Sequence, residues 1–282
     1  MDNKPSGRGN VATSDPTDPE EEPSRPEKLW SGSDLLLITS TIIFTFFIGL
    51  ALTSSLMTQK VPNHPEQAID TVSFTITASI VEFIVLVGCV YLLGLRRKAV
   101  NWDAMGVRPL VTIGVLTALG IGVLEFAVEN AITYGSQALF QINDTNAQAQ
   151  SSALQGLSWV NLVILAAITG LALPFAEEVF FRGVLYNYLK GHWGIWVGIV
   201  VSALVYALIS AGFFLDTLNG IAGLPMDILN GVAGIVLSLF AIWAYERTKS
   251  LWGAIIVHVI SSMGSLIIFY ALSTPWQHLP IL

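Results

Sequence analysis

The feature that most constrains the fold is a series of long apolar stretches, each close to the roughly twenty residues that a helix needs to cross a bilayer. A bilayer core offers no water to unpaired backbone groups, so an apolar stretch of this length satisfies those groups by forming a helix. The sequence therefore predicts an all-α fold, a polytopic membrane helical bundle of about seven transmembrane helices. The expected spans cover residues 34–57, 72–95, 109–132, 159–182, 194–214, 228–247 and 251–272.

Composition supports a membrane protein and excludes several other classes. Hydrophobic residues make up 53% of the chain and charged residues only 12%, whereas soluble domains carry about 25% charged residues. The single cysteine, Cys89, excludes an intrachain disulfide and a cysteine-based zinc site. There is no basic patch of the kind that binds nucleic acid, so membrane lipid is the first expected partner.

The chain divides into a short tail and one larger unit. Residues 1–29 are rich in proline and acidic side chains, which predicts a disordered tail. Residues 30–282 are expected to form a single membrane-embedded helical domain. Two polar or glycine-containing stretches, Asn143 to Ser158 and Ser210 to Asp227, are predicted to be loops.

Charge placement predicts the orientation. If there are seven spans, the basic residues near the span ends fall on one side, and Lys60 is the only one on the other. By the positive-inside rule, the N-terminus is expected in the cytoplasm and the C-terminus outside. Six tryptophans lie near span ends, where interfacial anchors are expected: Trp30, Trp159, Trp193, Trp196, Trp252 and Trp276.

The stretch from Leu173 to Gly183 carries two adjacent carboxylates and an arginine in an otherwise apolar run. In a helix, Glu178 and Arg182 are four residues apart and share a face, which predicts an ion pair. Glu177 points about a hundred degrees away from Glu178, free to face a cavity. Ionisable groups in a membrane helix cost several kcal/mol, so they occur where they pair or function. A purely structural ion pair would explain Glu178 and Arg182 but would leave Glu177 without a partner.

His258 lies in the last span, and Ser262 follows it four residues later on the same helix face. Together they could donate two hydrogen bonds to a developing oxyanion. The alternative is a histidine satisfied by a backbone carbonyl. Glu82 is expected to be deeply buried, and Glu125 and Glu129 form a like-charged pair that faces water or shares a proton.

The segment from Glu177 to Gly183 resembles the E-E-x-x-x-R signature of the CPBP family, the CAAX-prenyl-protease and bacteriocin-processing intramembrane endopeptidases. The approach from Tyr245 to Trp252 is similar to the family's lead into its last motif, and the resemblance covers roughly residues 100–272. It implies a helical bundle with a cavity, substrates that are prenylated or membrane-embedded peptides, and Glu177 as the residue that activates water. It leaves open whether zinc takes part, so no cofactor is certain.

The sequence departs from the family pattern at two positions. In the second motif, F-x-x-x-H, Tyr206 replaces the phenylalanine and Ser210 replaces the histidine. In the third, H-x-x-x-N, His258 is kept and Ser262 stands in place of the asparagine. A serine can donate a hydrogen bond to an oxyanion, but it is neither a base near neutral pH nor a usual zinc ligand.

Three functions are compatible with this pattern. The first is an intramembrane endopeptidase with the catalytic set Glu177, Glu178, Arg182, Ser210, His258 and Ser262, incomplete at Ser210. The second is an inactive family member that acts as an accessory or structural subunit of a membrane protein complex. The third, ranked last, is a small transporter with a proton path through Glu82, Glu177 and His258; the chain shows none of the paired repeats that transporters usually carry.

Overall fold

The computed structural model describes residues 29–59, 71–140, 157–210 and 224–273, and these parts are helices joined by short turns, without strands. The all-α bundle predicted from the sequence is therefore confirmed. The predicted disordered tail and the predicted loop from Asn143 to Ser158 lie almost entirely outside the described residues.

In the described residues, the helices form seven columns, each a single helix or a run of helices joined end to end. The first two columns are α1 (Gly32–Gln59) and α2 (Thr71–Cys89), which continues into the π-helical turn η1 (Val90–Arg96). A short 3₁₀ turn, η2 (Trp102–Met105), leads to the third column, α3 (Thr112–Phe140). The remaining elements are α5 (Trp159–Ala167), η3 (Ile168–Ala172), α6 (Leu173–Phe180), η4 (Phe181–Tyr186), α7 (Asn187–Trp193), α8 (Ile195–Ser210), α10 (Leu224–Thr248) and α11 (Leu251–Ser273).

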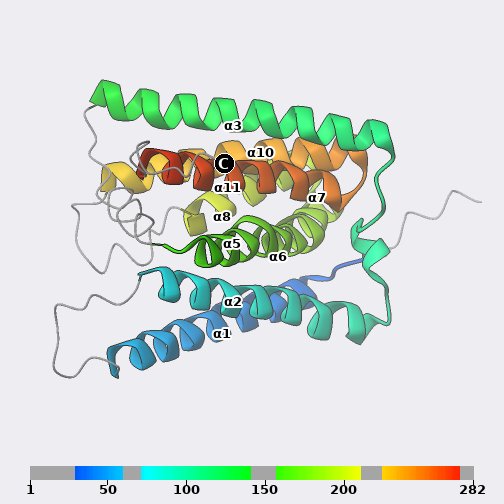
Figure 1. The fold of residues 1–282 in the computed structure, drawn as a ribbon. Helices are drawn as coiled ribbons and strands as arrows, with labels where there is room; N and C mark the ends of the chain where they lie inside the picture. Colours follow the sequence, from blue (N-terminus) through cyan, green and yellow to red (C-terminus); the bar gives the residue numbers. More distant parts are fainter. Residues whose placement is uncertain (1–28, 60–70, 141–156, 211–223, 274–282) are drawn as a thin grey trace, which may run out of the picture.

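The elements from α5 to α7 run end to end as one long central helix (Figure 1). On one side of it, α2 packs against α6 and α1 packs against α2. On the other side, α11 packs against α6, and α3 and α10 cover α11. The seventh column, α8, packs against α7 and α10. The central helix is thus placed to hold groups that several other helices can reach.

Six of these helices are long and apolar enough to cross a membrane, the central helix being counted as one from Trp159 to Trp193. The fifth expected span corresponds to α8, whose apolar part, Ile195–Ile209, is shorter. At a rise of about 1.5 Å per residue it covers less than the roughly 30 Å hydrocarbon core.

Two boundaries differ from those expected from the sequence. The fourth span continues well past residue 182 through Gly183 and Gly191, which keep helical backbone angles, and it ends at Gly194, whose φ is 89°. The expected loop from Ser210 to Asp227 is interrupted by the start of α10 at Leu224, with Pro225 in the first turn. Proline is tolerated at this position, because the first-turn N–H groups have no partner within the helix.

Trp30 is buried, with 1% of its surface exposed, and does not act as the interfacial anchor expected from its position. Its indole nitrogen donates a hydrogen bond of 2.7 Å to the carbonyl of Gly183 in η4. Its ring lies so close to Gly94 in η1 that a Cβ atom there would come within 2.9 Å of it. Trp30 therefore joins the start of α1 to the central helix.

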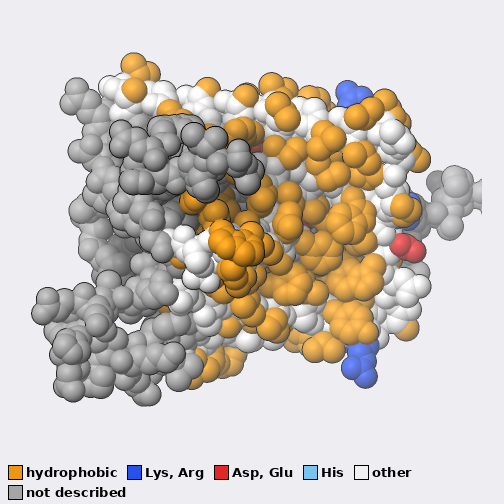
Figure 2. All heavy atoms as spheres, viewed as in Figure 1, with side chains coloured by type: hydrophobic (Ala, Val, Ile, Leu, Met, Phe, Trp, Pro, Cys, Tyr) orange, Lys and Arg blue, Asp and Glu red, His pale blue; other side chains and the backbone are white. Residues whose placement is uncertain are grey.

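The basic side chains gather at one end of the bundle, which we call the basic end. Figure 2 shows apolar side chains over most of one face, with the visible Lys and Arg side chains near its edges at the end where α2 leads into α3. Contacts tie this end together: Lys98 binds Asp34 at 2.8 Å, and Ser250 Oγ donates to the carbonyl of Arg108. Among described residues, the basic end comprises Arg96, Arg97, Lys98, Arg108, Lys190, Arg247 and Lys249; only Arg182 lies in the interior.

This charge distribution generates a prediction about orientation. The basic end should face the cytoplasm by the positive-inside rule. The helix α11, which starts at this end just after Lys249 and is long enough to cross, then places the C-terminus outside. A fluorescent reporter that matures only in the cytoplasm should stay dark when fused after Leu282 and should fluoresce when fused after Lys249. Bright fluorescence from the Leu282 fusion would contradict the predicted orientation.

Candidate active site

The central helix contains two π-helical turns, η3 and η4, on either side of α6. Pro174, in the first turn of α6, has no N–H to donate to the carbonyl of Gly170, so the regular hydrogen-bond ladder is interrupted where η3 lies. Such turns widen a helix locally and are frequent at functional sites. The eight residues of α6 between them carry both glutamates of the motif.

Glu178 and Arg182 form the predicted ion pair. Arg182 Nη1 lies 2.9 Å from Glu178 Oε1, and both side chains are completely buried. Arg182 Nη2 also donates a hydrogen bond of 3.2 Å to the carbonyl of Ser238 in α10. The pair neutralises two charges that would be costly alone in a low-dielectric interior, and it links the central helix to α10.

His258 reaches the same carboxylate from α11. Its Nδ1 lies 2.9 Å from Glu178 Oε1. Because the carboxylate can only accept, Nδ1 carries the proton and donates it. Glu178 therefore fixes the orientation of the imidazole ring and directs Nε2 toward the rest of the site.

Glu177 lies on the other side of this imidazole. His258 Nε2 is 3.7 Å from Glu177 Oε2, and the Tyr206 hydroxyl from α8 lies between them. Tyr206 donates to Glu177 Oε2 at 2.9 Å and lies 3.3 Å from His258 Nε2. The phenol has a single proton, which the shorter contact assigns to Glu177. Glu177 therefore has a hydrogen-bond partner that the sequence analysis did not identify.

Exposure distinguishes the two glutamates. The Glu177 side chain is 17% exposed, whereas that of Glu178 is fully buried. Glu178 is committed to Arg182 and His258, so only Glu177 can meet a water molecule or a substrate. The arrangement matches an accessible carboxylate for proton transfer, next to an imidazole held by a second carboxylate.

The structure describes only one of the two serine side chains predicted for this site. Ser210 is the last residue of α8, one turn beyond Tyr206, and its side chain lies outside what the structure describes. Ser262 is partly buried on α11, one turn beyond His258. Its neighbour Ser261 donates a hydrogen bond of 2.6 Å to Glu129 of α3. The roles of Ser210 and Ser262 stay predictions.

The third helix carries a second acidic pair that is separate from this site. Glu125 is completely buried, which corrects one of the two expectations for it, that it faces water. Glu129 is partly exposed and accepts the hydrogen bond from Ser261.

A cavity of about 860 Å³ lies beside the site, between α1, α2, η4 and α8. Its walls are mostly apolar, including Phe181 and Val205, and Glu82 is the charged residue that lines it. Glu82 lies close enough to Glu177 for the two carboxylates to repel each other. Several residues of α1 and α8 at the cavity are exposed on the outer surface, among them Leu36, Ile43 and Leu208, so it opens between these two helices.

The residues of the site do not fit a zinc ion. Zinc sites use at least three protein ligands in most cases, and the described residues contain no group of three His, Cys, Asp or Glu side chains arranged to hold a metal. The Arg182 guanidinium and the His258 Nδ1–H already occupy Glu178 Oε1. We therefore derive no step through a metal.

Comparison with known proteins supports the resemblance. Residues 159–263 match the family described as type II CAAX prenyl endopeptidase Rce1-like. This stretch, which is less than half of the chain, is similar to that family. The match begins at the start of the central helix, ends within α11 and includes all six predicted site residues. No curated protein and no solved structure matches the chain.

Within the Rce1-like stretch, the residue that sequence reasoning missed is Tyr206. It was noted only as a replacement for phenylalanine, yet its hydroxyl connects Glu177 with His258. Its ring also packs edge-on against Phe181 and lies 5.1 Å from the Arg182 guanidinium carbon. A signal was present in the sequence, because a buried phenol in an apolar helix needs a hydrogen-bond partner.

The buried ion pair generates a stability prediction. Arg182→Met should leave Glu178 charged and without its guanidinium, which costs about 3–5 kcal/mol, and should lower the thermal unfolding temperature in detergent. The double variant Glu178→Gln with Arg182→Met should recover part of the loss, because no unpaired charge remains. Arg96→Met, which removes an exposed arginine, should have little effect. Wild-type stability of Arg182→Met would contradict the pairing.

Proposed function

We propose that this protein is an intramembrane CAAX-type endopeptidase that binds prenylated or membrane-embedded peptides and cleaves them slowly. The observation that carries the proposal is the convergence of Glu177 and His258, 3.7 Å apart, with Glu178 binding the imidazole Nδ1 and Arg182 paired with Glu178. The Rce1-like match over the same residues supports the reaction class.

The proposed roles follow from the contacts of each residue. Glu177, the accessible carboxylate, takes a proton from the attacking water. His258, oriented by Glu178, accepts that proton from Glu177 at Nε2, and the resulting imidazolium stabilises the developing oxyanion or returns the proton to the leaving amine. Ser262 is proposed as a further donor to the oxyanion, one turn along α11. Arg182 does not meet the substrate in this scheme; it neutralises Glu178 and positions it.

The apolar cavity supports the proposed substrate class. Ligand pockets have volumes of roughly 300–1,000 Å³ and are mostly apolar, with a few polar groups. The cavity of about 860 Å³ has these properties, and its opening between α1 and α8 would admit a ligand from the lipid phase. A prenyl chain would bury its hydrocarbon against Phe181 and Val205, with the peptide directed toward Glu177.

Slow cleavage is expected from the second motif. Ser210 replaces a histidine, and a missing general base typically removes a factor of ~10²–10⁴ in rate. The Tyr206 hydroxyl also occupies Glu177 Oε2, so an attacking water must share that oxygen or bind the other one. These two features favour a second candidate function, a binding subunit that does not cleave.

Restoring the second motif should test the proposal. In proteoliposomes with a farnesylated CAAX peptide, the wild type should cleave slowly, and Ser210→His should increase the rate. Adding Tyr206→Phe should increase it further, because the phenol no longer occupies Glu177. Glu177→Ala should abolish both the basal rate and the gain.

Two controls separate the alternatives. Leu204→His places an imidazole on the outward face of α8, where the side chain is 49% exposed, and should give no gain. Binding of the peptide is measured for each variant in parallel, and Glu177→Ala is included as the variant that should bind without cleaving. If the restored variants bind the peptide and do not cleave it, the protein is a binding subunit. If no variant binds the peptide, the proposed substrate class is wrong.

A further inference from the structure

A second cavity, of about 560 Å³, lies between the first turns of α3 and the last turns of α10. We call it the α3–α10 pocket, and its walls include Leu110, Val111, Thr117, Trp243, Arg247 and Thr248. It has no lining residue in common with the cavity beside Glu177. From its position and chemistry, we propose that the α3–α10 pocket binds an anionic phospholipid, with the headgroup phosphate on Arg247.

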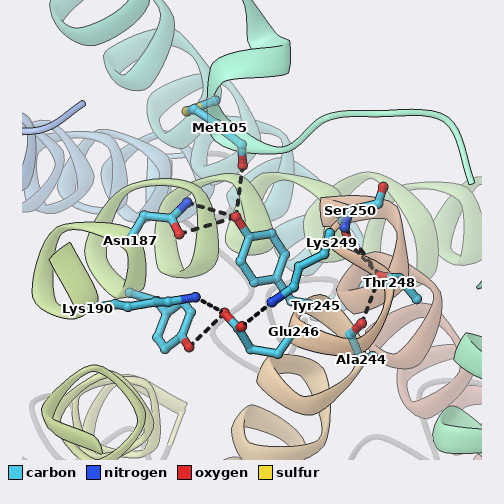
Figure 3. Close-up of polar contacts among 10 residues, drawn as sticks. Met105, Asn187, Lys190, Ala244, Tyr245, Glu246, Thr248, Lys249 and Ser250 are labelled. Carbon is cyan, nitrogen blue, oxygen red and sulfur yellow. Dashed lines mark hydrogen bonds and ion pairs between the residues drawn. The ribbon is translucent and has the colours of Figure 1, made fainter. Parts of the chain in front are cut away.

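Arg247 is the charged group of the pocket, and no acidic side chain lines the pocket with it. Its side chain is exposed, and among the described residues it forms no ion pair. The adjacent acid, Glu246, is already bound by Lys190 at 2.5 Å and by Lys249 at 2.7 Å (Figure 3). Tyr186 donates a further hydrogen bond to Glu246 at 2.9 Å. The Arg247 charge is therefore available to an anion from outside the chain.

The two threonine hydroxyls of the pocket are satisfied internally. Thr117 Oγ1 donates to the carbonyl of Ile113 at 2.7 Å, and Thr248 Oγ1 donates to the carbonyl of Ala244 at 2.7 Å. What remains for a ligand is the guanidinium, with the Trp243 ring and the apolar side chains of Leu110, Val111, Ile113 and Ile121 around it. A ligand that fits has one anionic group and a hydrocarbon portion, because a guanidinium binds phosphate through paired hydrogen bonds.

The pocket faces the lipid phase. Val111 and Ile113 are 69% and 70% exposed, and Trp243 is 42% exposed. Both helices reach the pocket at the basic end, where Arg108 and Lys249 also lie, so the pocket is at one membrane interface. Tryptophan and arginine near a span end are typical of that depth. These features favour a membrane lipid over a soluble anion.

The wall of the pocket is held in place before any ligand arrives. Leu251 N donates to the carbonyl of Gly106 at 2.7 Å, and Ser250 Oγ donates to the carbonyl of Arg108. These bonds attach the segment before α3 to the turn between α10 and α11. A preformed site has less ordering entropy to lose when it binds.

The test measures retention of phosphatidylglycerol by native mass spectrometry, on full-length protein purified from mixed phosphatidylcholine and phosphatidylglycerol membranes. Arg247→Gln should reduce retention on the order of tenfold or more, because a charge-assisted contact is lost. Arg96→Gln is the matched control, since it removes an exposed arginine at the same end but away from the pocket. General surface attraction is worth about fivefold per basic residue, and it would act equally on both variants.

A second variant tests the cavity without changing charge. Thr117→Phe fills the pocket wall and should also reduce retention, while Arg247 stays in place. Equal losses from Arg247→Gln and Arg96→Gln would overturn the proposal in favour of diffuse charge attraction. Unchanged retention in Thr117→Phe would overturn the pocket as the binding place. Displacement of the lipid by millimolar inorganic phosphate would show that the site takes a soluble anion.

Discussion

The buried pair of Glu178 and Arg182 is the interaction on which the candidate site depends. Removing either charge would leave the other unpaired in an apolar interior, so the two are retained together. The pair also joins helices. Glu178 accepts a hydrogen bond from His258 Nδ1 of α11, and Arg182 donates one to the carbonyl of Ser238 in α10. The two glutamates thus differ in function because their neighbours differ. Glu178 is bound by Arg182 and His258 inside the bundle, so Glu177 is the carboxylate that can contact a ligand.

The π-helical turns of the central helix explain how its backbone can bind side chains from other parts of the chain. In a regular helix each carbonyl is used by the residue four positions on. In η4 the carbonyl of Gly183 instead accepts from the Trp30 indole and from the Asn187 side chain, at 2.7 and 3.3 Å. The first helix is therefore anchored to the same element that carries Arg182. Local irregularity at Phe181–Tyr186 connects the site to the rest of the bundle.

Features that depend on local geometry were predictable, and features that depend on tertiary contacts were not. The spans follow from apolar length, and the Glu178–Arg182 pair follows from spacing along one helix. Tyr206, in contrast, meets Glu177 across two helices that are separated by 29 positions in the chain. Trp30 has the position of an interfacial anchor, and only its contact with Gly183, 153 positions away, explains its burial. The central helix is longer than its predicted span, 159–182, because apolar length sets only the roughly twenty residues that a crossing needs and not where the helix ends.

The hydrogen bond from Tyr206 to Glu177 also gives the two departures in the second motif a common physical reason. A carboxylate near Glu178 and Glu82 needs a donor, because an unsatisfied charged group in an apolar interior is costly. In the family pattern a histidine lies in that motif, and here the position holds Ser210. A phenol at Tyr206 supplies a donor from the same helix, one turn earlier, without a proton that it can release near neutral pH. Under the proposed function, the phenol keeps Glu177 hydrogen-bonded in the bundle, while the loss of the histidine removes a group that could share its proton chemistry. The stability of the site and the rate of the proposed reaction are then separable.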